Sequence, residues 1–382
     1  MEPISSKDRI LSIDILRGLA LVGIFIVNII SFHTPVLYIN PFEWWEYRNT
    51  LLNYEWIDIF LEGSVYPIFA LLFGFGLAVI RQRAVNKGES FSRIGSRRLV
   101  LLLFLGALHA IFIWFGDILI NYALLGFLLM TVLSYSGRRL IYFGLTLLLI
   151  PNLLFVFYLS WSSITNPYGA MIWTDIGGVK ESIASYTSTS YFAALHQRLI
   201  DWYAVNNPAN FLYMLTTILP MMLIGAGAFK TNLFLKVKEN KGYWIAGMIV
   251  LLCLGILLKS LPYLLLQNNV FLYIQDIIGG PITAMGYIAA ILLIVGNPLA
   301  EKMLKPLAAA GRMSLTIYLM QSILSSFIFY GYGMGMYNKL PLETGVWVAI
   351  GIFMIQVILA EIWFSKFTYG PLESIWRKWT YR

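Results

Sequence analysis

The chain has 382 residues, of which 59% are hydrophobic and only 12% are charged, and its formal net charge is +8. Soluble domains are about 45–50% apolar and about 25% charged, so this composition excludes an ordinary soluble protein. Many apolar stretches reach the roughly 20 residues that a helix needs to cross a bilayer. The composition therefore predicts an all-α, polytopic membrane protein.

Ten membrane spans are predicted in chain order, within a single transmembrane domain that covers residues 1–382. Their approximate limits are 13–33, 56–80, 99–115, 117–135, 139–160, 208–229, 243–263, 274–296, 307–330 and 344–366. An even number of spans places both termini on the same side of the membrane. The first span carries charged residues and is followed by no small-residue cleavage site, so we expect a retained helix and not a cleaved signal peptide.

The lysine and arginine residues indicate which side faces the cytoplasm. Of the 27 basic residues, 22 fall in one set of connections. The remaining five are Arg48, Lys180, Arg198, Lys259 and Lys339. The positive-inside rule therefore predicts that both termini are cytoplasmic. The same bias accounts for the net charge of +8, so nucleic acid is not expected as a partner.

The predicted outer side is aromatic and includes the long segment 161–206. Within it, SYFAALHQRLIDWY places Tyr191, Leu195, Leu199 and Trp202 at helical spacing. This pattern predicts a short helix that lies on the outer surface of the membrane.

The first span has two charged residues near its start. Asp14 and Arg17 are three residues apart, so on a helix they share a face and can form an ion pair. In a structural interpretation, Asp14 caps the helix and Arg17 extends to the cytoplasmic headgroups. In a functional interpretation, Arg17, oriented by Asp14, binds a phosphate-bearing ligand at the cytoplasmic mouth.

Asn28 and His33 are polar positions deeper in the same span. Asn28 returns within roughly 40° of the face of Asp14, about 21 Å further along the axis. It can join two helices by hydrogen bonds or line a polar path. His33 is a candidate general base. It lies about 140° round the helix from Asn28, so it joins that face only if the helix ends or bends near Ile30.

His109 and Asp117 form a second candidate pair. His109 lies about ten residues into an apolar span, where an ionisable side chain is a functional candidate by default. A histidine can act as a general base near neutral pH. Asp117 follows at the outer turn and can reach His109 or His33 only if the helices pack that way.

The sequence contains no recognisable metal-binding or nucleotide-binding motif. Three scattered histidines and a single cysteine, Cys253, do not form a zinc-binding pattern. There is no GxSxG elbow and no Walker-type loop. We therefore expect no metal site and no ATP-driven pump.

Five stretches resemble the YeiB-like family of bacterial membrane proteins, which is catalogued as domain of unknown function 418. They are RILSIDILRGLALVGIFIVNI, VYPIFALLFGFG, RRLVLLLFLGALHAIFIWFGDILINYA, AAAGRMSLTIYLMQS and GPLESIWRKWTY. They occur in the family's order and cover nearly the whole chain, with a family-typical C-terminal region at about 225–382. The resemblance implies a multi-pass protein of the bacterial cytoplasmic membrane.

The opening also resembles a wider group of transmembrane acyltransferases that includes the lysosomal heparan-alpha-glucosaminide N-acetyltransferase. That resemblance implies transfer of an acyl group from cytoplasmic acyl-coenzyme A to an acceptor across the membrane, with a membrane-embedded histidine as base. Asp14, Arg17, Gly18 and Asn28 match the shared opening motif. His33 follows Asn28 more closely than the corresponding histidine does in the heparan enzyme, so His109 competes with it as the base.

The leading hypothesis is a membrane acyltransferase. Arg17 would hold the phosphates of acyl-coenzyme A, His33 or His109 would deprotonate a hydroxyl or amine acceptor near the outer face, and Asn28 would stabilise the oxyanion. The other candidate phosphate-binding residues are Arg97, Arg98, Arg138 and Arg139.

Two other interpretations stay open. In a transporter or lipid flippase, the same polar stripe would line a substrate path, and Pro67, Pro220 and Pro281 would mark broken helices. In a structural or signalling protein without chemistry, the candidate histidines and Asn28 would tolerate alanine. The expected partners are membrane lipids and a lipid, glycan or small-molecule acceptor, and a homodimer stays open.

Overall fold

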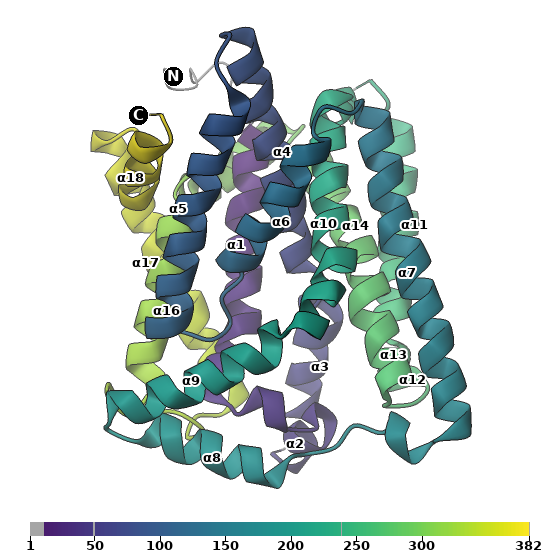
Figure 1. Ribbon diagram of the computed structural model, residues 1–382, viewed down its shortest axis with the longest axis vertical. Helices are drawn as coiled ribbons and strands as arrows, with labels where there is room; N and C mark the ends of the chain where they lie inside the picture. Colours follow the sequence, from purple (N-terminus) through teal and green to yellow (C-terminus); the bar gives the residue numbers. More distant parts are fainter. Residues whose placement is uncertain (1–10, 49, 238, 382) are drawn as a thin grey trace.

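The computed structural model describes residues 11–48, 50–237 and 239–381, and over these residues the chain is an all-α bundle without a named β-strand (Figure 1). Eight helical segments of the described chain are long and apolar enough to cross a membrane. They are α1 (Leu11–His33), α3 (Leu51–Phe60) with α4 (Val65–Asn86), α5 (Phe91–Phe112), α7 (Gly137–Thr165), α10 (Pro208–Lys230), α11 (Lys241–Lys259), α13 (Asn269–Tyr273) with η5 (Ile274–Gly279) and α14 (Gly280–Ile294), and α17 (Leu342–Lys366). The predicted polytopic all-α fold is confirmed.

Two of the ten predicted spans correspond to shorter apolar helices, α6 (Leu119–Val132) and α16 (Ser314–Phe329). The 14 residues of α6 extend over about 21 Å, less than the hydrocarbon thickness of about 30 Å. The predicted span 307–330 is divided between α15 (Pro298–Arg312) and α16, because Met313 between them has a backbone (φ −118°, ψ 40°) that is not helical.

The break in the second span lies at Gly63 and not at Pro67. Gly63 has φ +67°, which favours glycine. Pro67 lies in the first turn of α4, where a missing N–H leaves no helical hydrogen bond unmade. Pro220 lies inside α10, which continues through it. Pro281 lies at the start of α14, directly after the π-helical turn η5.

The remaining helices connect the spans or lie across the ends of the bundle. They are η2 (Val36–Tyr38), α2 (Pro41–Tyr47), η3 (Tyr168–Ala170), α8 (Ile176–Thr187), α9 (Tyr191–Asn206), η4 (Leu233–Val237), α12 (Leu261–Leu264) and α18 (Pro371–Thr380).

The two ends of the bundle differ in character. The start of α1 and the C-terminal helix α18 lie at one end, while α2, α8 and α9 lie at the other (Figure 1). The first end also carries the α4–α5 connection, rich in arginine and lysine. We call it the basic end and the other the outer end, because the positive-inside rule assigns the basic end to the cytoplasm.

Glycine allows two pairs of helices to approach at backbone distance. A Cβ atom on Gly74 of α4 would overlap the carbonyl of Met222, and one on Gly225 of α10 would overlap the carbonyl of Leu71. On α15, a Cβ atom on Gly311 would overlap the carbonyl oxygen of Asp14. Such small-residue contacts are a main source of helix association in membranes. The α1–α15 contact places Arg17 beside the end of α15.

The helix predicted within SYFAALHQRLIDWY is present as α9, and the outer segment contains a second helix, α8. The buried face of α9 is not the predicted apolar stripe but contains Gln197, Arg198 and Asp201, while Leu199 is 41% exposed. The reason is polar pairing: the hydroxyl of Tyr38 and Gln197 Nε2 donate to Asp201 Oδ1 at 2.5 and 2.9 Å. Polar contacts therefore hold α9 against the outer end.

Candidate active site

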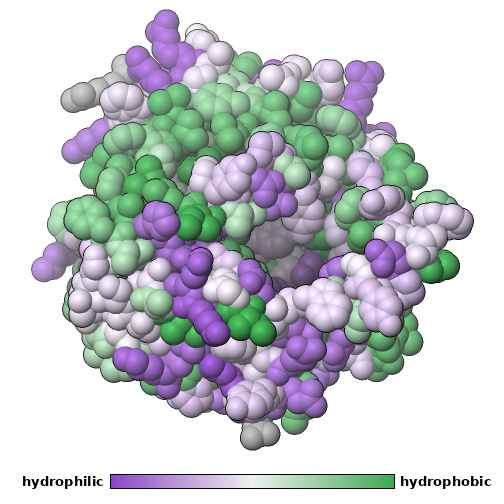
Figure 2. All heavy atoms as spheres, turned by 60° about the horizontal axis from the view of Figure 1, so that its bottom comes forward, coloured by the Kyte–Doolittle hydropathy of each residue, from purple (hydrophilic) through white to green (hydrophobic). Residues whose placement is uncertain are grey.

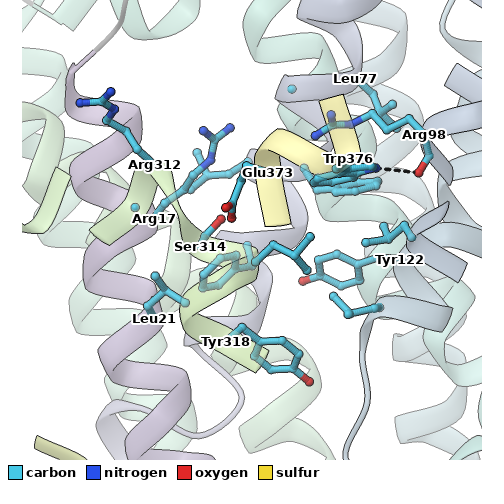
Figure 3. Close-up of a pocket in the computed structure, with 18 of the residues that line it drawn as sticks. Arg17, Leu21, Leu77, Arg98, Tyr122, Arg312, Ser314, Tyr318, Glu373 and Trp376 are labelled. Atoms are coloured by element: carbon cyan, nitrogen blue, oxygen red, sulfur yellow. Dashed lines mark hydrogen bonds between the residues drawn. The ribbon is translucent and has the colours of Figure 1, made fainter. Parts of the chain in front are cut away.

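A cavity of about 300 Å³ lies inside the bundle towards the basic end. It is lined by side chains from six elements: α1, α4, α5, α6, the α15–α16 region and the C-terminal residues that include α18. Its charged lining residues are Arg17, Arg98, Arg312, Arg377 and Glu373. Its aromatic lining residues are Phe69, Phe73, Tyr122, Tyr318, Tyr369, Trp376 and Tyr381. The lining is therefore basic and aromatic (Figure 3).

Arg17 enters this cavity from α1. Its Nη1 lies 3.3 Å from Asp14 Oδ1, so the predicted pair forms. Leu21 and Ile24 follow on the same lining face. Gly76 of α4 faces the guanidinium, because a Cβ atom there would lie in ordinary van der Waals contact, 3.7 Å from Arg17 Nη2. Arg17 is thus oriented by a carboxylate while its donors remain beside the cavity.

Helix α18 packs against the basic end of the cavity. The guanidinium of Arg98 lies 3.5 Å from the ring centroid of Trp376, and Trp376 Nε1 donates to the carbonyl of Arg98 at 2.9 Å (Figure 3). Glu373 accepts hydrogen bonds from Thr316 N at 3.0 Å and Thr316 Oγ1 at 2.6 Å. These contacts tie the C-terminal helix to α5 and α16 and fix the position of Arg98.

The other two arginines are held by aromatic rings and backbone. Arg312 lies 3.7 Å from the centroid of Phe364 and donates to the carbonyl of Thr368 at 3.3 Å. Arg377 stacks over Tyr369 at 4.8 Å. Because Glu373 is the single acidic residue among the described residues of the lining, the cavity carries an excess of positive charge. Arginine is well suited to binding phosphate or carboxylate through paired hydrogen bonds.

His109 and Asp117 meet beside the deep end of the cavity. His109 Nδ1 lies 2.8 Å from Asp117 Oδ2, and both side chains are fully buried. Asp117 Oδ1 accepts a hydrogen bond from Ile120 N at 2.9 Å. The carboxylate therefore holds the proton on Nδ1, and Nε2 has no hydrogen-bond partner among the described residues. A base oriented by a carboxylate with its second nitrogen unoccupied is the arrangement that general-base catalysis uses.

Tyr318 separates His109 from the cavity. Its side chain lines the cavity, and its ring centroid lies 5.1 Å from that of His109. Its hydroxyl donates to the carbonyl of Gly116 at 3.4 Å. Gly106 permits the close approach of α5 and α6, because a Cβ atom there would lie 2.8 Å from Ile120 N. The pair and the cavity are thus neighbours with one aromatic side chain between them.

His33 lies away from this cavity. Helix α1 continues through Ile30 to His33, so the interruption that would have brought His33 to the face of Asn28 is not present. His33 is fully buried, and its Nδ1 donates to the carbonyl of Ile29 at 2.6 Å. Its ring packs near Phe329, with centroids 5.5 Å apart. The structure thus places His33 apart from the arginine residues of the cavity.

The remaining residues that were proposed from the sequence lie outside the cavity lining, at different distances from it along the chain. Asn28 is half-buried one turn beyond Ile24, on the face of α1 that lines the cavity, but it does not itself line it. Arg97 contacts α18, because Trp379 Nε1 donates to its carbonyl at 3.2 Å, and its side chain does not line the cavity. Arg138 and Arg139 are exposed at the start of α7 and are also outside the lining.

Among the lining residues, only Arg17 and Arg98 were proposed as site residues from the sequence. Arg312, Arg377 and Tyr318 are examples of those that were not. The arginine residues were assigned only to the charge bias, and Tyr318 was part of an apolar span. The amphipathic stretch PLESIWRKWT was the available signal, since a polar helix after the last span must lie against the bundle or the membrane surface.

The outer helices cover the end of α5 beyond His109. Arg198 Nη1 donates to the carbonyl of Ile111 at 2.9 Å, and the hydroxyl of Tyr191 donates to that of Phe112 at 2.7 Å. Burial raises the pKa of Asp201 above its ordinary value, and the hydrogen bonds that its carboxylate accepts oppose the shift. The outer helices thus cover the end of α5, and the His109–Asp117 pair near it is fully buried.

The fold and the cavity together define a multi-pass helical membrane protein with a basic, aromatic-lined site inside the bundle. Residues 228–382 match the family described as "Protein of unknown function (DUF418)". The Bacillus subtilis (strain 168) protein YxaH is 31% identical over an alignment 404 positions long, which covers 100% of this chain and 96% of the relative. The Escherichia coli (strain K12) protein YeiB is 28% identical over an alignment 406 positions long, which covers 98% of this chain and 97% of YeiB. The chain therefore belongs to the YeiB-like, DUF418 family.

Proposed function

We propose that this protein is an acyltransferase of the bacterial cytoplasmic membrane that moves an acyl group from cytoplasmic acyl-coenzyme A to an acceptor at the outer face. The observation that supports this proposal is the arginine-lined cavity at the basic end, whose deep wall, Tyr318, contacts the His109–Asp117 pair. A phosphate-bearing thioester and an oriented base are the two parts that such a transfer needs.

The donor would bind with its phosphates at the arginines of the basic end. Arg17 and Arg98 lie at the two sides of the cavity (Figure 3), and guanidinium groups bind phosphate oxygens in pairs. Aromatic side chains such as Trp376 offer a surface on which the nucleobase of coenzyme A could stack. A cavity of about 300 Å³ is at the lower limit for small-molecule sites. It would hold the thioester arm while the nucleotide end stays at the mouth.

The chemistry would use His109 as the base. Its Nε2 would take the proton from the acceptor hydroxyl or amine as that atom attacks the thioester carbonyl carbon. Asn28, which lies one turn beyond Ile24 on the same face of α1, would donate a hydrogen bond to the oxyanion. Collapse of the tetrahedral intermediate breaks the C–S bond, and the leaving thiolate takes the proton from His109, with Asp117 stabilising the transient imidazolium. Movement of Tyr318 would open His109 to the thioester.

The test of this proposal is acyl transfer by the purified protein in proteoliposomes. Acetyl-coenzyme A is supplied with a polar-lipid and envelope-glycan extract as acceptor, and release of the coenzyme A thiol is followed. We expect thiol release with the wild type, strong loss with His109→Ala and no change with His196→Ala, a histidine exposed on α9. Equal thiol release from empty liposomes and from both variants would contradict the proposal.

A transporter or lipid flippase is the second candidate. The observation that favours it is the pair of interrupted spans, α3–α4 and α13–η5–α14, since discontinuous helices commonly form substrate sites in transporters. Movement of labelled lipid or glycan across proteoliposomes that contain no acyl donor would favour transport. Dependence of that movement on acetyl-coenzyme A would favour transfer.

A further inference from the structure

A second group of ionisable side chains lies among the membrane-spanning helices, where the two interrupted spans meet. It contains Asp58 of α3, Glu62 of the α3–α4 turn, Lys259 of α11 and Asp276 of η5. Ionisable groups at this depth are costly and are functional candidates by default. None of them lines the arginine cavity, so the proposed acyl transfer does not use them. We call this group the carboxylate–lysine cluster.

The cluster is connected by short polar contacts. Lys259 is fully buried, and its Nζ lies 3.2 Å from Asp276 Oδ1. Asp58 is also buried, and its Oδ2 accepts hydrogen bonds from the hydroxyl of Tyr263 at 2.7 Å and from Gln275 Nε2 at 2.6 Å. Elements α3, α11, α12 and η5 therefore supply two adjacent polar groups, Lys259–Asp276 and Asp58–Tyr263–Gln275.

The charges of the cluster do not balance. Glu62 interacts electrostatically with Asp58, Asp276 and Lys259. In the part of the chain that the structure describes, its carboxyl group forms no ion pair and no side-chain hydrogen bond. Three ionised carboxylates facing one ammonium would leave two negative charges of the cluster without a counter-charge, and such charges are costly wherever burial removes them from water. A proton on one carboxyl group removes one of these charges.

Gln275 indicates a hydrogen-bond donor that the network needs. The side chain is fully buried and faces Asp58 through Nε2, while its Oε1 has no partner among the described residues. An amide oxygen can only accept, and a protonated carboxyl group is a donor. A buried acceptor without a donor costs about 1–3 kcal/mol. The amide of Gln275 thus presents an open acceptor beside Asp58, and a protonated carboxyl group is a donor that would satisfy it.

Two glycine residues allow the α3–α4 turn and the start of α14 to approach each other closely beside the cluster. A Cβ atom on Gly63 would lie 2.7 Å from Asp276 Oδ1, and one on Gly280 would overlap the carbonyl of Gly63. Asp276 itself lies in the π-helical turn Ile274–Gly279. Single π-helical turns within α-helices are frequent at functional sites. The helix break and the π-turn therefore contact each other at Asp276.

Asp276 connects the cluster to an open cleft. Its side chain is 33% exposed, and it lines a cleft of about 360 Å³ together with Phe155 of α7, Tyr213 of α10 and Tyr273 of α13. Asp276 lies seven residues after the start of α13 at Asn269, which is the outer end of this span. The outer side of the molecule is hollowed (Figure 2). The cleft therefore exposes Asp276, the partly accessible member of the cluster, within seven residues of the outer end of its span.

We propose that the carboxylate–lysine cluster binds one exchangeable proton, which enters from the outer end through Asp276. The proton is shared among Asp58, Glu62 and Asp276, and Lys259 keeps the remaining charge low. The other titratable groups that face the cluster are Tyr54, Glu55, Tyr66, Tyr213, Tyr263 and Tyr273. A metal ion is not the ligand that this geometry fits, because no group of three His, Cys, Asp or Glu residues among the described residues has metal-binding spacing.

The test is infrared spectroscopy of the purified wild-type protein in liposomes, which detects the carbonyl stretch of a protonated carboxylic acid. We expect this band at pH 7, where ordinary exposed carboxyl groups with a pKa of about 4 are ionised, and its disappearance as the pH is raised further. The band should shift when the protein is transferred to heavy water, since the site is open to solvent. Absence of any such band at pH 7 in the wild type would overturn the proposal.

Isosteric variants locate the proton. Asp58→Asn, Glu62→Gln and Asp276→Asn are each expected to weaken or remove the band, whereas Glu301→Gln, a control on the exposed surface of α15, should leave it unchanged. A band that persists at full strength in all three cluster variants contradicts the proposal. A band that disappears when sodium replaces potassium at constant pH identifies a sodium site and also contradicts it. These outcomes do not depend on acyl transfer, so either proposal can fail alone.

Discussion

Replacement of Asp117 separates the stability of the His109–Asp117 pair from its chemistry. Asp117→Ala removes the acceptor for Ile120 N in the first turn of α6, a bond comparable to a helix cap, whose typical contribution is about 0.5–2 kcal/mol. It also leaves His109 Nδ1 buried without its partner, at about 1–3 kcal/mol. The free energy of unfolding should therefore fall by about 1.5–5 kcal/mol.

Asp117→Asn should behave differently. The amide oxygen can still accept from Ile120 N, and the amide nitrogen donates to His109 Nδ1, so the free energy of unfolding should fall by less than about 1 kcal/mol. The donated hydrogen bond places the histidine proton on Nε2, which can then no longer act as the base. The rate of acyl transfer should fall by about 10²- to 10⁴-fold.

The assay is unfolding by sodium dodecyl sulfate in mixed micelles, combined with the thiol-release measurement. Asp175→Ala is the matched control, because Asp175 caps α8 through Gly178 N at 3.0 Å and has no histidine partner. Its cost should be the capping contribution alone. The reasoning is refuted if Asp117→Ala costs no more than Asp175→Ala, or if Asp117→Asn retains the wild-type rate.

Three further predictions concern packing, pH and the C-terminal helix. Gly311→Ala should lower the free energy of unfolding by about 1–3 kcal/mol through overlap with α1, whereas Gly351→Ala, with open space around it, should not. Because burial raises the pKa of Asp201, its stabilising contribution is complete below the unfolded-state pKa of about 3.9 and is lost as the pH rises through the folded-state pKa. The unfolding free energy of the wild type should therefore fall relative to Asp201→Asn as the pH rises, in detergent titrations. Trp376→Leu should free the guanidinium of Arg98 and make α18 more sensitive to limited proteolysis; unchanged cleavage would contradict the cation–π contact.

The spans and the His109–Asp117 pair were accessible to sequence reasoning, for physical reasons. An apolar run of sufficient length has few alternatives to crossing the bilayer. His109 and Asp117 lie near the same end of an apolar helix, where few other polar side chains can bind them. The sequence also indicated the condition under which Asp117 would reach His109. It did not distinguish Arg17 and Arg98, which line the cavity, from Arg138 and Arg139, which do not, because that depends on how distant helices pack.

The carboxylate–lysine cluster was not predictable from the sequence. Its members come from three separate spans, and only their packing brings Lys259 within 3.2 Å of Asp276. The break at Gly63 was missed because Pro67 is the more conspicuous residue, yet proline in the first turn of a helix is well tolerated. A glycine that takes a positive φ and contacts another helix is the signal that matters there.

Equilibrium binding of radiolabelled acetyl-coenzyme A to the purified protein tests the central claim most directly. We predict saturable binding that is weakened about 10- to 100-fold by Arg17→Gln, since a charge-assisted hydrogen bond contributes about 1.5–3 kcal/mol. Arg138→Gln, at the same end but outside the cavity, should bind as the wild type does. Absence of saturable binding by the wild type, or equal weakening by both substitutions, would contradict the assignment of this cavity as the donor site.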